Sequence, residues 1–278
     1  MTRRLRLLLL AALATASPAA RAGPPPARAA SAGPHQSHGH PNAGRLVGAK
    51  RWADTPHARR LPDHAASAAY GMPGLVELTQ RAARAVARRH PRSVLLVGDL
   101  SLEHGGPIAG HHSHQNGRDI DVGFYTADAG GKPMLTSSFL PFDAQGRATT
   151  APGVRFDDAR NWSFVRALLT DGRAEVRAVF VANWLRDRLL REAERQGAPR
   201  ELVARAAAVM MQPPDAEPHH DHFHVRIACV ESQRAAFCRD DSLPRPGGEG
   251  GPPFVPVDSS KAAPAGPFAP VDSSARGG

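Results

Sequence analysis

The chain has 278 residues with 26 glycines and 26 prolines, and its 35 lysines and arginines against 26 acidic residues give a formal net charge of +9. Beyond the N-terminus no run approaches the ~20 apolar residues of a membrane-spanning helix, which excludes an integral membrane protein once a leader has been removed. The basic residues are scattered and follow no zinc-finger, RNP or helix-turn-helix pattern, so nothing points to nucleic acid as a partner.

The first 22 residues have the three parts of a secretory signal peptide. A basic start is followed by an apolar run over residues 7–14 and by Ala-Arg-Ala at 20–22, which fits a small-x-small cleavage site. A buried first helix is the alternative. Cleavage would remove four arginines and no acids, so the charge would fall to about +5. We therefore expect an exported, mildly basic protein, which suits a polyanionic envelope or acidic peptide substrates.

Two further segments lack the periodicity of helices or strands. Residues 23–45 are rich in Pro, Ala, Gly and His, which predicts a disordered linker whose HQSHGH run either binds metal loosely or is merely polar. Residues 244–278 contain two copies of a PFxPVDSS octamer, too few and too proline-rich to bury a core. We predict a disordered Pro/Gly-rich tail there, and hence a folded domain over residues 46–243.

The intervening part of the chain predicts an α+β domain, because helical and strand patterns are mixed along it. Apolar residues at helical spacing predict helices over residues 72–90, 160–169, 184–196 and 199–211. Alternating or short β-branched runs predict strands over residues 93–100, 118–125, 175–183 and 222–229.

The chain has two cysteines, Cys229 and Cys238, nine residues apart. In an exported chain such an even pair predicts one disulfide that closes a short loop. Two free buried thiols are the alternative. Two cysteines are too few for a four-cysteine zinc site, and a disulfide would leave no thiol to act as a nucleophile.

Seven of the fourteen histidines lie in two clusters beside predicted strands, HHSH at 111–114 and HHDHFH at 219–224. Neutral imidazole is the commonest metal ligand, and carboxylate is a frequent third partner of catalytic zinc. Three protein ligands with one open position is the arrangement that metal-assisted hydrolysis requires. The alternative for each cluster is a solvated polar loop.

The spacing within the clusters favours a shared site. His222 and His224 are two residues apart, so on a strand they point to the same face. Asp119 and Asp121 also share a face, and an Asn-Gly turn before them would let His114 fold back toward both. Spacing leaves open which aspartate is the ligand. HExxH and GxSxG are absent, which excludes a helix-borne zincin site and a nucleophile elbow.

The order of these residues resembles the group of zinc peptidases that contains lysostaphin, D-Ala-D-Ala peptidases and the hedgehog signalling domain. The shared pattern is His, six residues, Asp and later His-x-His, which here is His114, Asp121 and His222-Phe223-His224. GHHSHQNGRDIDV followed by HxxHFHVRIAC is more specifically similar to penicillin-insensitive murein endopeptidases, over roughly residues 60–238. The resemblance implies that a small antiparallel sheet flanked by helices carries the zinc site.

Carried over by position, the resemblance implies that zinc is bound by three side chains, His114, Asp121 and His224. His222 then stands where such enzymes have a general base or a residue that stabilises the oxyanion, and His219 matches a further histidine of the family's active site. A histidine suits the transfer of a proton near neutral pH, since its pKa begins at about 6.5.

Other polar residues near the motifs have more than one possible role. His111 matches a position that binds a second metal in some relatives, but the downstream Asp-x-x-His of those proteins is missing, and Asp157 and Asp158 in that region either contribute or cap a helix. Asp119 is expected to orient a ligand histidine. Arg118 and Arg226 are either contacts for substrate carboxylates or ordinary surface arginines.

The resemblance implies a periplasmic, zinc-dependent murein endopeptidase with one zinc per chain and peptidoglycan as its partner. The bond that it implies lies between D-alanine and meso-diaminopimelate. One alternative is a D-Ala-D-Ala carboxypeptidase or dipeptidase, although Glu217 does not stand where those relatives carry their glutamate. Another is a non-enzymatic zinc-binding module of the periplasm, and a third is a metal-buffering protein that uses HQSHGH.

Overall fold

The computed structural model describes residues 33–213, 217–234 and 236–240, which all belong to one unit of the chain. The predicted signal peptide and the repeated tail lie outside these residues, so both stay predictions. Within the described ranges, no helix combines the length and the apolar character that crossing a membrane requires.

The predicted α+β class is confirmed, because four helices and four strands form where the patterns placed them. The helices are α1 Pro73–Arg89, α2 Asp158–Thr170, α3 Asn183–Arg195, α4 Arg200–Val209 and the short α5 Glu231–Arg234. The strands are β1 Gln36–His40, β2 Ala43–Val47, β3 Lys50–Arg51, β4 Ala58–Arg60, β5 Tyr70–Gly71, β6 Leu95–Val97, β7 Asp119–Gly123, β8 Thr126–Ala127, β9 Pro133–Met134, β10 Arg155–Phe156, β11 Val176–Phe180, β12 Met210–Met211 and β13 His222–Ile227. The strands that the patterns missed are mostly two or three residues long.

The central sheet has six strands in the order β12-β11-β13-β7-β6-β4. Its middle strands are antiparallel neighbours, but β12 and β4 run parallel to β11 and β6 at the two edges. The prediction of an antiparallel sheet is therefore wrong for the edges. The reason is that α3 and α4 lie between β11 and β12, and α1 between β4 and β6, and such helical crossovers produce parallel pairs. The likeness to the hedgehog fold stays a prediction.

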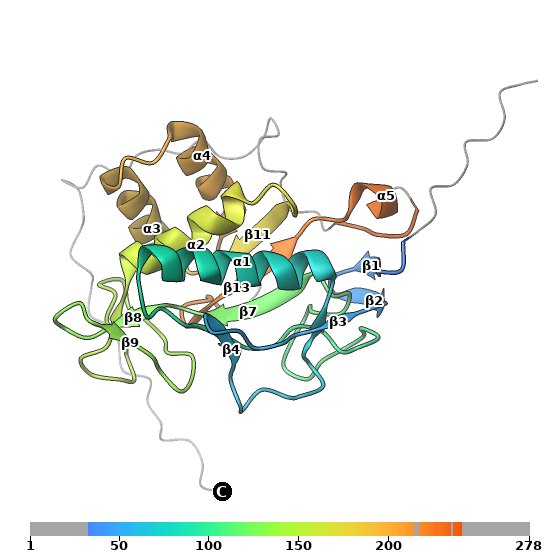
Figure 1. The fold of residues 1–278 in the computed structure, drawn as a ribbon, viewed down its shortest axis with the longest axis horizontal. Helices are drawn as coiled ribbons and strands as arrows, with labels where there is room; N and C mark the ends of the chain where they lie inside the picture. Colours follow the sequence, from blue (N-terminus) through green and yellow to red (C-terminus); the bar gives the residue numbers. More distant parts are fainter. Residues whose placement is uncertain (1–32, 214–216, 235, 241–278) are drawn as a thin grey trace, which may run out of the picture. The chain divides into compact units, whose positions relative to one another are not determined.

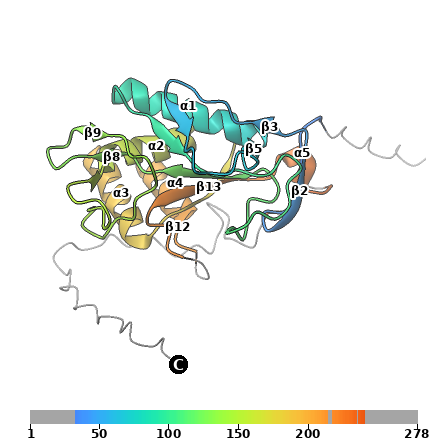
Figure 2. The same ribbon diagram turned by 90° about the horizontal axis from the view of Figure 1, so that it is seen from below.

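Helices α1 and α2 pack side by side over one face of this sheet (Figures 1 and 2). Helix α1 begins at Pro73, whose missing N–H and fixed φ suit a first turn, and ends with Arg88 and Arg89 next to its negative pole. The sheet meets the helices through apolar side chains such as Phe223 of β13, whose ring stacks on Phe164 of α2 with centroids 6.1 Å apart. The core lies between these two layers.

Strands β1 and β2 form an antiparallel hairpin that begins in the predicted linker and ends just after it, so the prediction of disorder is wrong for residues 36–45. Partners from the far end of the chain hold the hairpin. The Gly39 N–H donates to the Phe237 carbonyl at 2.9 Å, and the His38 ring stacks on the Phe237 ring at 4.2 Å. Local composition cannot reveal partners about 200 residues away, which is why the pattern missed this hairpin.

The predicted disulfide between Cys229 and Cys238 is present, with Cα atoms 5.9 Å apart. It closes the loop that carries α5 and Gln233, whose side-chain oxygen accepts from the Ser37 N–H at 3.0 Å. The disulfide thus fixes the C-terminal segment against which β1 packs.

Candidate metal centre

The two histidine clusters meet in one cleft of about 740 Å³ on the face of the sheet opposite α1 and α2. The first cluster comes from the loop before β7, and the second from the segment that leads into β13. Pro41 and Asn42, at the turn of the β1–β2 hairpin, line the cleft as well. The clusters are therefore not separate solvated loops, and the hairpin contributes to the rim.

The pairing of β7 with β13 places the two motifs opposite each other. In this antiparallel pair His224 lies opposite Asp121, and Arg226 lies opposite Asp119. Because side chains alternate between the faces of a strand, all four point to the cleft while their neighbours point to the helices. The His-x-His and Asp-x-Asp spacings thus build one polar surface from strands about 100 residues apart in the chain.

A tight turn before β7 brings His114 back over the strand. His114 has a φ of +67°, which is unusual for a residue other than glycine, and its N–H donates to Asp119 at 3.1 Å. Gly117 has a φ of +79°, and a Cβ there would come within 2.7 Å of the Leu46 side chain. The prediction that this turn folds His114 toward the aspartates is confirmed.

Hydrogen bonds to the protein leave one ring nitrogen on each of two histidines facing the same oxygen. His114 donates from Nδ1 to the Leu100 carbonyl at 2.9 Å, and its Nε2 lies 3.3 Å from Asp121 Oδ1. His224 donates from Nε2 to Asp119 Oδ1 at 3.0 Å, and its Nδ1 lies 3.3 Å from the same Asp121 oxygen. Such outer partners select the ring tautomer and aim the bare nitrogen at a metal.

Two of the atoms that face one another at this site are buried without a hydrogen-bond partner among the described residues. His114 Nε2 and Asp121 Oδ1 are both buried, and neither makes a hydrogen bond in the described part of the chain. A buried polar atom without a partner costs free energy, and a buried charge costs more. A cation between them would supply the missing interaction, and two imidazoles with a carboxylate are a donor set that zinc accepts. The residues present therefore fit a bound metal.

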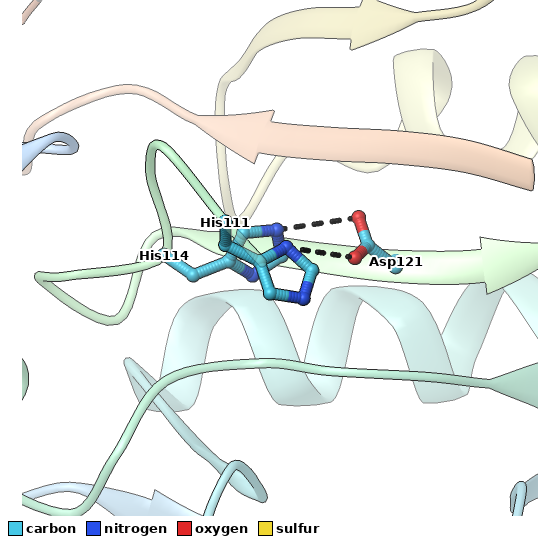
Figure 3. Close-up of side chains that lie close together, drawn as sticks. All are labelled: His111, His114 and Asp121. Carbon is cyan, nitrogen blue, oxygen red and sulfur yellow. Dashed lines mark ion pairs between the residues drawn. The ribbon is translucent and has the colours of Figure 1, made fainter. Parts of the chain in front are cut away.

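His111 forms a compact group of candidate ligand atoms with His114 and Asp121 (Figure 3). These three atoms lie within 4.8 Å of one another. His111 approaches the second carboxylate oxygen, with Nδ1 3.7 Å from Asp121 Oδ2. His111 thus groups with His114 and Asp121, while His224 approaches the same Asp121 oxygen as His114.

Both oxygens of Asp119 are already bonded to other groups of the protein. Its Oδ1 accepts from Arg226 Nε at 2.5 Å and from His224 Nε2, while Oδ2 accepts from the His114 N–H. Burial favours protonation, yet Arg226 and His224 hold the pKa of Asp119 well below its usual range. The structure thereby separates the roles of two aspartates that spacing could not distinguish.

Of the two predicted catalytic histidines, His222 lies beside the Asp121 carboxylate and His219 lies beside His222. His222 donates from Nδ1 to Asp221 at 2.7 Å, and its Nε2 lies 3.5 Å from Asp121 Oδ1. Burial opposes its protonation, but Asp121 and then Asp221 raise the pKa of His222 to about 10. The His219 ring lies 5.1 Å from the His222 ring, and burial, followed by the repulsion of His224 and His222, lowers the pKa of His219 to about 3.

Three residues around the site were not predicted. Asp99 accepts from His111 Nε2 at 3.1 Å and lies 3.0 Å from His64 Nδ1. Burial raises its pKa, but those hydrogen bonds from His111 and His64 hold the pKa of Asp99 well below its usual range. Asp221 orients His222, and the Phe139 ring stacks on His222 at 5.2 Å. The one local signal was that Asp99 lies near the end of the strand predicted over residues 93–100.

The remaining candidates serve the fold. Arg118 is buried and donates to the Ile227 carbonyl, to Asp240 and to the Arg239 carbonyl. Arg226 lines the cleft but is bound to Asp119, so neither is an ordinary surface arginine. Asp157 caps α2 by accepting from the Arg160 N–H at 2.9 Å, and Asp158 pairs with Arg188, so neither joins the metal centre.

The fold and the site together define an α+β protein with a candidate His/Asp metal centre at the floor of an open cleft. A family model described as penicillin-insensitive murein endopeptidase matches residues 37–252, and the chain belongs to that family. The match begins inside β1, so it includes the hairpin at the rim as well as both histidine clusters.

Several bacterial proteins named penicillin-insensitive murein endopeptidase are similar to this chain. The protein of Haemophilus influenzae is 28% identical over 186 residues, which cover 65% of this chain and 58% of the relative. Proteins of Escherichia coli O1:K1 / APEC and Klebsiella pneumoniae subsp. pneumoniae are each 25% identical over 64% of this chain and 60% of the relative. The chain thus matches less than two thirds of the length of these relatives.

Proposed function

We propose that the protein is a zinc-dependent endopeptidase that is exported to the periplasm and hydrolyses peptide cross-links of peptidoglycan. The bond that we assign is the one between D-alanine and meso-diaminopimelate. Membership of a family described as murein endopeptidase supports the reaction. A cleft of about 740 Å³, open to solvent and lined by histidines, supports a peptide substrate that enters from a large polymer.

One observation carries the choice of ligands. The bare nitrogens of His114 and His224 both lie 3.3 Å from Asp121 Oδ1, and each opposite nitrogen is already bonded to the protein. We therefore assign the zinc to His114, Asp121 and His224. His111, which reaches the other oxygen of Asp121, is available to a second metal. When bound, zinc would polarise the scissile carbonyl and lower the pKa of a water ligand.

His222 is the residue to which we assign proton transfer. Asp221 accepts its Nδ1–H, which leaves Nε2 as the basic nitrogen of the neutral ring, 3.5 Å from Asp121. The negative charge of Asp121 raises the pKa of His222, and a divalent cation on that carboxylate would counter the rise. Phe139, stacked on the ring, fixes its orientation. His222 would accept a proton from water and return it to the leaving amine.

His219 has a different task in this proposal. Its pKa of about 3 keeps the ring neutral at pH 7, and its Nδ1 is buried without a hydrogen bond in the described residues. The backbone holds it in place, because the His219 carbonyl accepts from the Ala182 N–H at 2.8 Å. A neutral imidazole at this wall of the cleft can donate a hydrogen bond to the substrate and hold it for attack.

The test is to measure metal content and product formation on one purified sample. We expect about one zinc per chain and conversion of cross-linked muropeptide dimers to monomers, with the activity lost to a chelator and restored by zinc. The activity should persist in β-lactams, because no acyl-enzyme forms. A preparation that is loaded with zinc and leaves the dimers intact would contradict the proposal.

The alternatives predict different products. A D-Ala-D-Ala carboxypeptidase would release free D-alanine and leave cross-links intact, whereas a non-enzymatic zinc module would release nothing. The metal-buffering alternative needs the HQSHGH run as a metal site. Residues 36–40 of this run form strand β1, and His38 stacks on Phe237, which favours a role in the fold over metal buffering.

A further inference from the structure

The outer side of the helical layer carries a groove rich in arginine, far from the histidines. The groove lies between α1 and the end of α2 and has a volume of about 360 Å³. Small side chains leave it open, and the alanines that line it are Ala82, Ala85 and Ala167. Four arginines surround them, which are Arg81, Arg84 and Arg88 of α1 and Arg173 of the loop after α2.

Most of this positive charge is unbalanced. Arg81 binds Asp171, the one acid that lines the groove, with Nε–Oδ2 and Nη2–Oδ1 distances of 2.6 Å and 3.0 Å. Arg84, Arg88 and Arg173 are exposed, and their side chains form no ion pair with the residues that the structure describes. Arg84 and Arg88 are four residues apart on the helix, where like charges are destabilising. Such an arrangement favours an anionic partner.

The contact between Arg81 and Asp171 indicates the chemistry of that partner. A guanidinium presents a planar fork of donors that matches a carboxylate with two parallel hydrogen bonds, and Arg81 already binds Asp171 in this way. The three neighbouring guanidiniums offer the same donors to carboxylates from outside the chain.

We propose that this groove is a second binding site for peptidoglycan, occupied by free carboxylates of its stem peptides. The inference rests on the proposed function, which supplies the polymer. Charge complementarity supports this occupant, because the groove combines four arginines with one acid and the stem peptides are acidic. The groove would hold the enzyme on the polymer, whereas the cleft would carry out hydrolysis.

The position of the groove requires a polymer. His222 and His224 line the cleft on one face of β13, while Phe223 between them packs on Phe164 of α2 on the other face. The sheet and the helical layer thus separate the groove from the cleft, as the placement of α1 and α2 in Figure 2 illustrates. Because the sheet and the helices lie between the two sites, the occupant of the groove would be a second stretch of the polymer. Two linked contacts increase residence without any change at the cleft.

The test compares two variants with equal loss of charge. Arg84→Gln/Arg88→Gln removes two groove arginines, and Arg191→Gln/Arg200→Gln removes two exposed arginines from α3 and α4. Both are made in a His222→Ala background, so that purified sacculi stay intact while the bound fraction is measured by sedimentation. We expect the groove variant to bind roughly fivefold more weakly, as for two exposed ion pairs, and the control to bind like its parent. Equal losses in both variants would overturn the proposal.

Three further measurements make the test specific. With an intact His222, the groove variant should cleave soluble muropeptide dimers at the parent rate but intact sacculi more slowly. Sacculi whose carboxylates have been converted to amides should lose most of their binding, and undiminished binding would overturn the proposal. Binding to phosphatidylglycerol vesicles that depends on the groove, with none to sacculi, would also overturn it. If the soluble dimers are not cleaved at all, the proposed function fails, while sedimentation still tests the groove.

Discussion

The two faces of the β7–β13 pair come from the same alternating sequence, but different forces hold their side chains. The helix face is apolar, and its side chains are Ile120, Val122, Phe223 and Val225. The cleft face is polar, and its side chains are Asp119, Asp121, His224 and Arg226, none of them more than 7% exposed. One face is therefore a hydrophobic core, and the other is a buried network of charges.

The contrast teaches how each face tolerates change. On the helix face close packing is sufficient, and a side chain of similar volume can replace another at modest cost. On the cleft face each buried polar atom needs a specific partner, and loss of one partner leaves the other group uncompensated. Substitutions on the helix face should therefore act on stability alone, and those on the cleft face on metal binding and turnover as well.

The largest effect should come from Asp121→Asn, because this carboxylate faces His114 and His224 at 3.3 Å. We expect zinc to be lost and kcat/KM on muropeptide dimers to fall by about a thousandfold or more, since a metal contributes several kcal/mol to such reactions. Asp187→Asn, the same change at a half-buried position of α3 outside the cleft, serves as the control. A variant that keeps both zinc and activity would refute the ligand assignment.

Phe223→Ala tests the helix face of the same strand. The Phe223 ring packs edge-to-face on Phe124 with centroids 4.6 Å apart and is fully buried. Truncation leaves a cavity, so we expect the free energy of unfolding to fall by about 3–5 kcal/mol in urea titrations. The remaining folded fraction should still bind zinc. A loss below about 1 kcal/mol would mean that the sheet does not depend on this contact.

Asp119→Asn tests the support of the metal centre. The substitution removes the charge that faces Arg226 and weakens the acceptor for His224 Nε2. We expect zinc affinity, measured by competition with a chelator, to fall about 10–100-fold, as is typical for outer partners of metal ligands. Stability should fall by about 3 kcal/mol, because Arg226 is left buried without its carboxylate. Unchanged zinc affinity would show that Asp119 does not position the ligands.

The smallest effect should come from Asp157→Ala at the start of α2. Its side chain accepts from the Arg160 N–H at 2.9 Å and also pairs with the Arg160 guanidinium. Loss of an N-cap typically costs about 1 kcal/mol, and thermal unfolding should report a decrease of that size. Zinc content and kcat/KM should not change, because Asp157 lies outside the metal centre. A loss of zinc in this variant would contradict the conclusion that Asp157 lies outside the metal centre.

Local patterns in the sequence, which are the alternation of strands and the spacing of helices, were sufficient to predict much of the fold. The alternation in 118–125 and 222–229 predicted which side chains share a face, and helical spacing predicted α1 to α4. These periods are local, because a strand or a helix imposes its repeat on nearby residues only. Spacing also indicated that the two histidine clusters share one site and that the cysteines pair, whereas the choice of His114, Asp121 and His224 as candidate ligands came from the family resemblance.

What the sequence by itself determined is thus the set of donors, the faces that they occupy and the family to which their order belongs. Only the tertiary structure decided that Asp121 faces the imidazoles while Asp119 supports them, that Asp99 holds His111, and that the hairpin from 36–47 forms a rim. The reason is that each of these outcomes depends on partners from other parts of the chain. The periodicity of the sequence predicts the face to which a side chain points, but only the packing of distant segments decides which group it contacts.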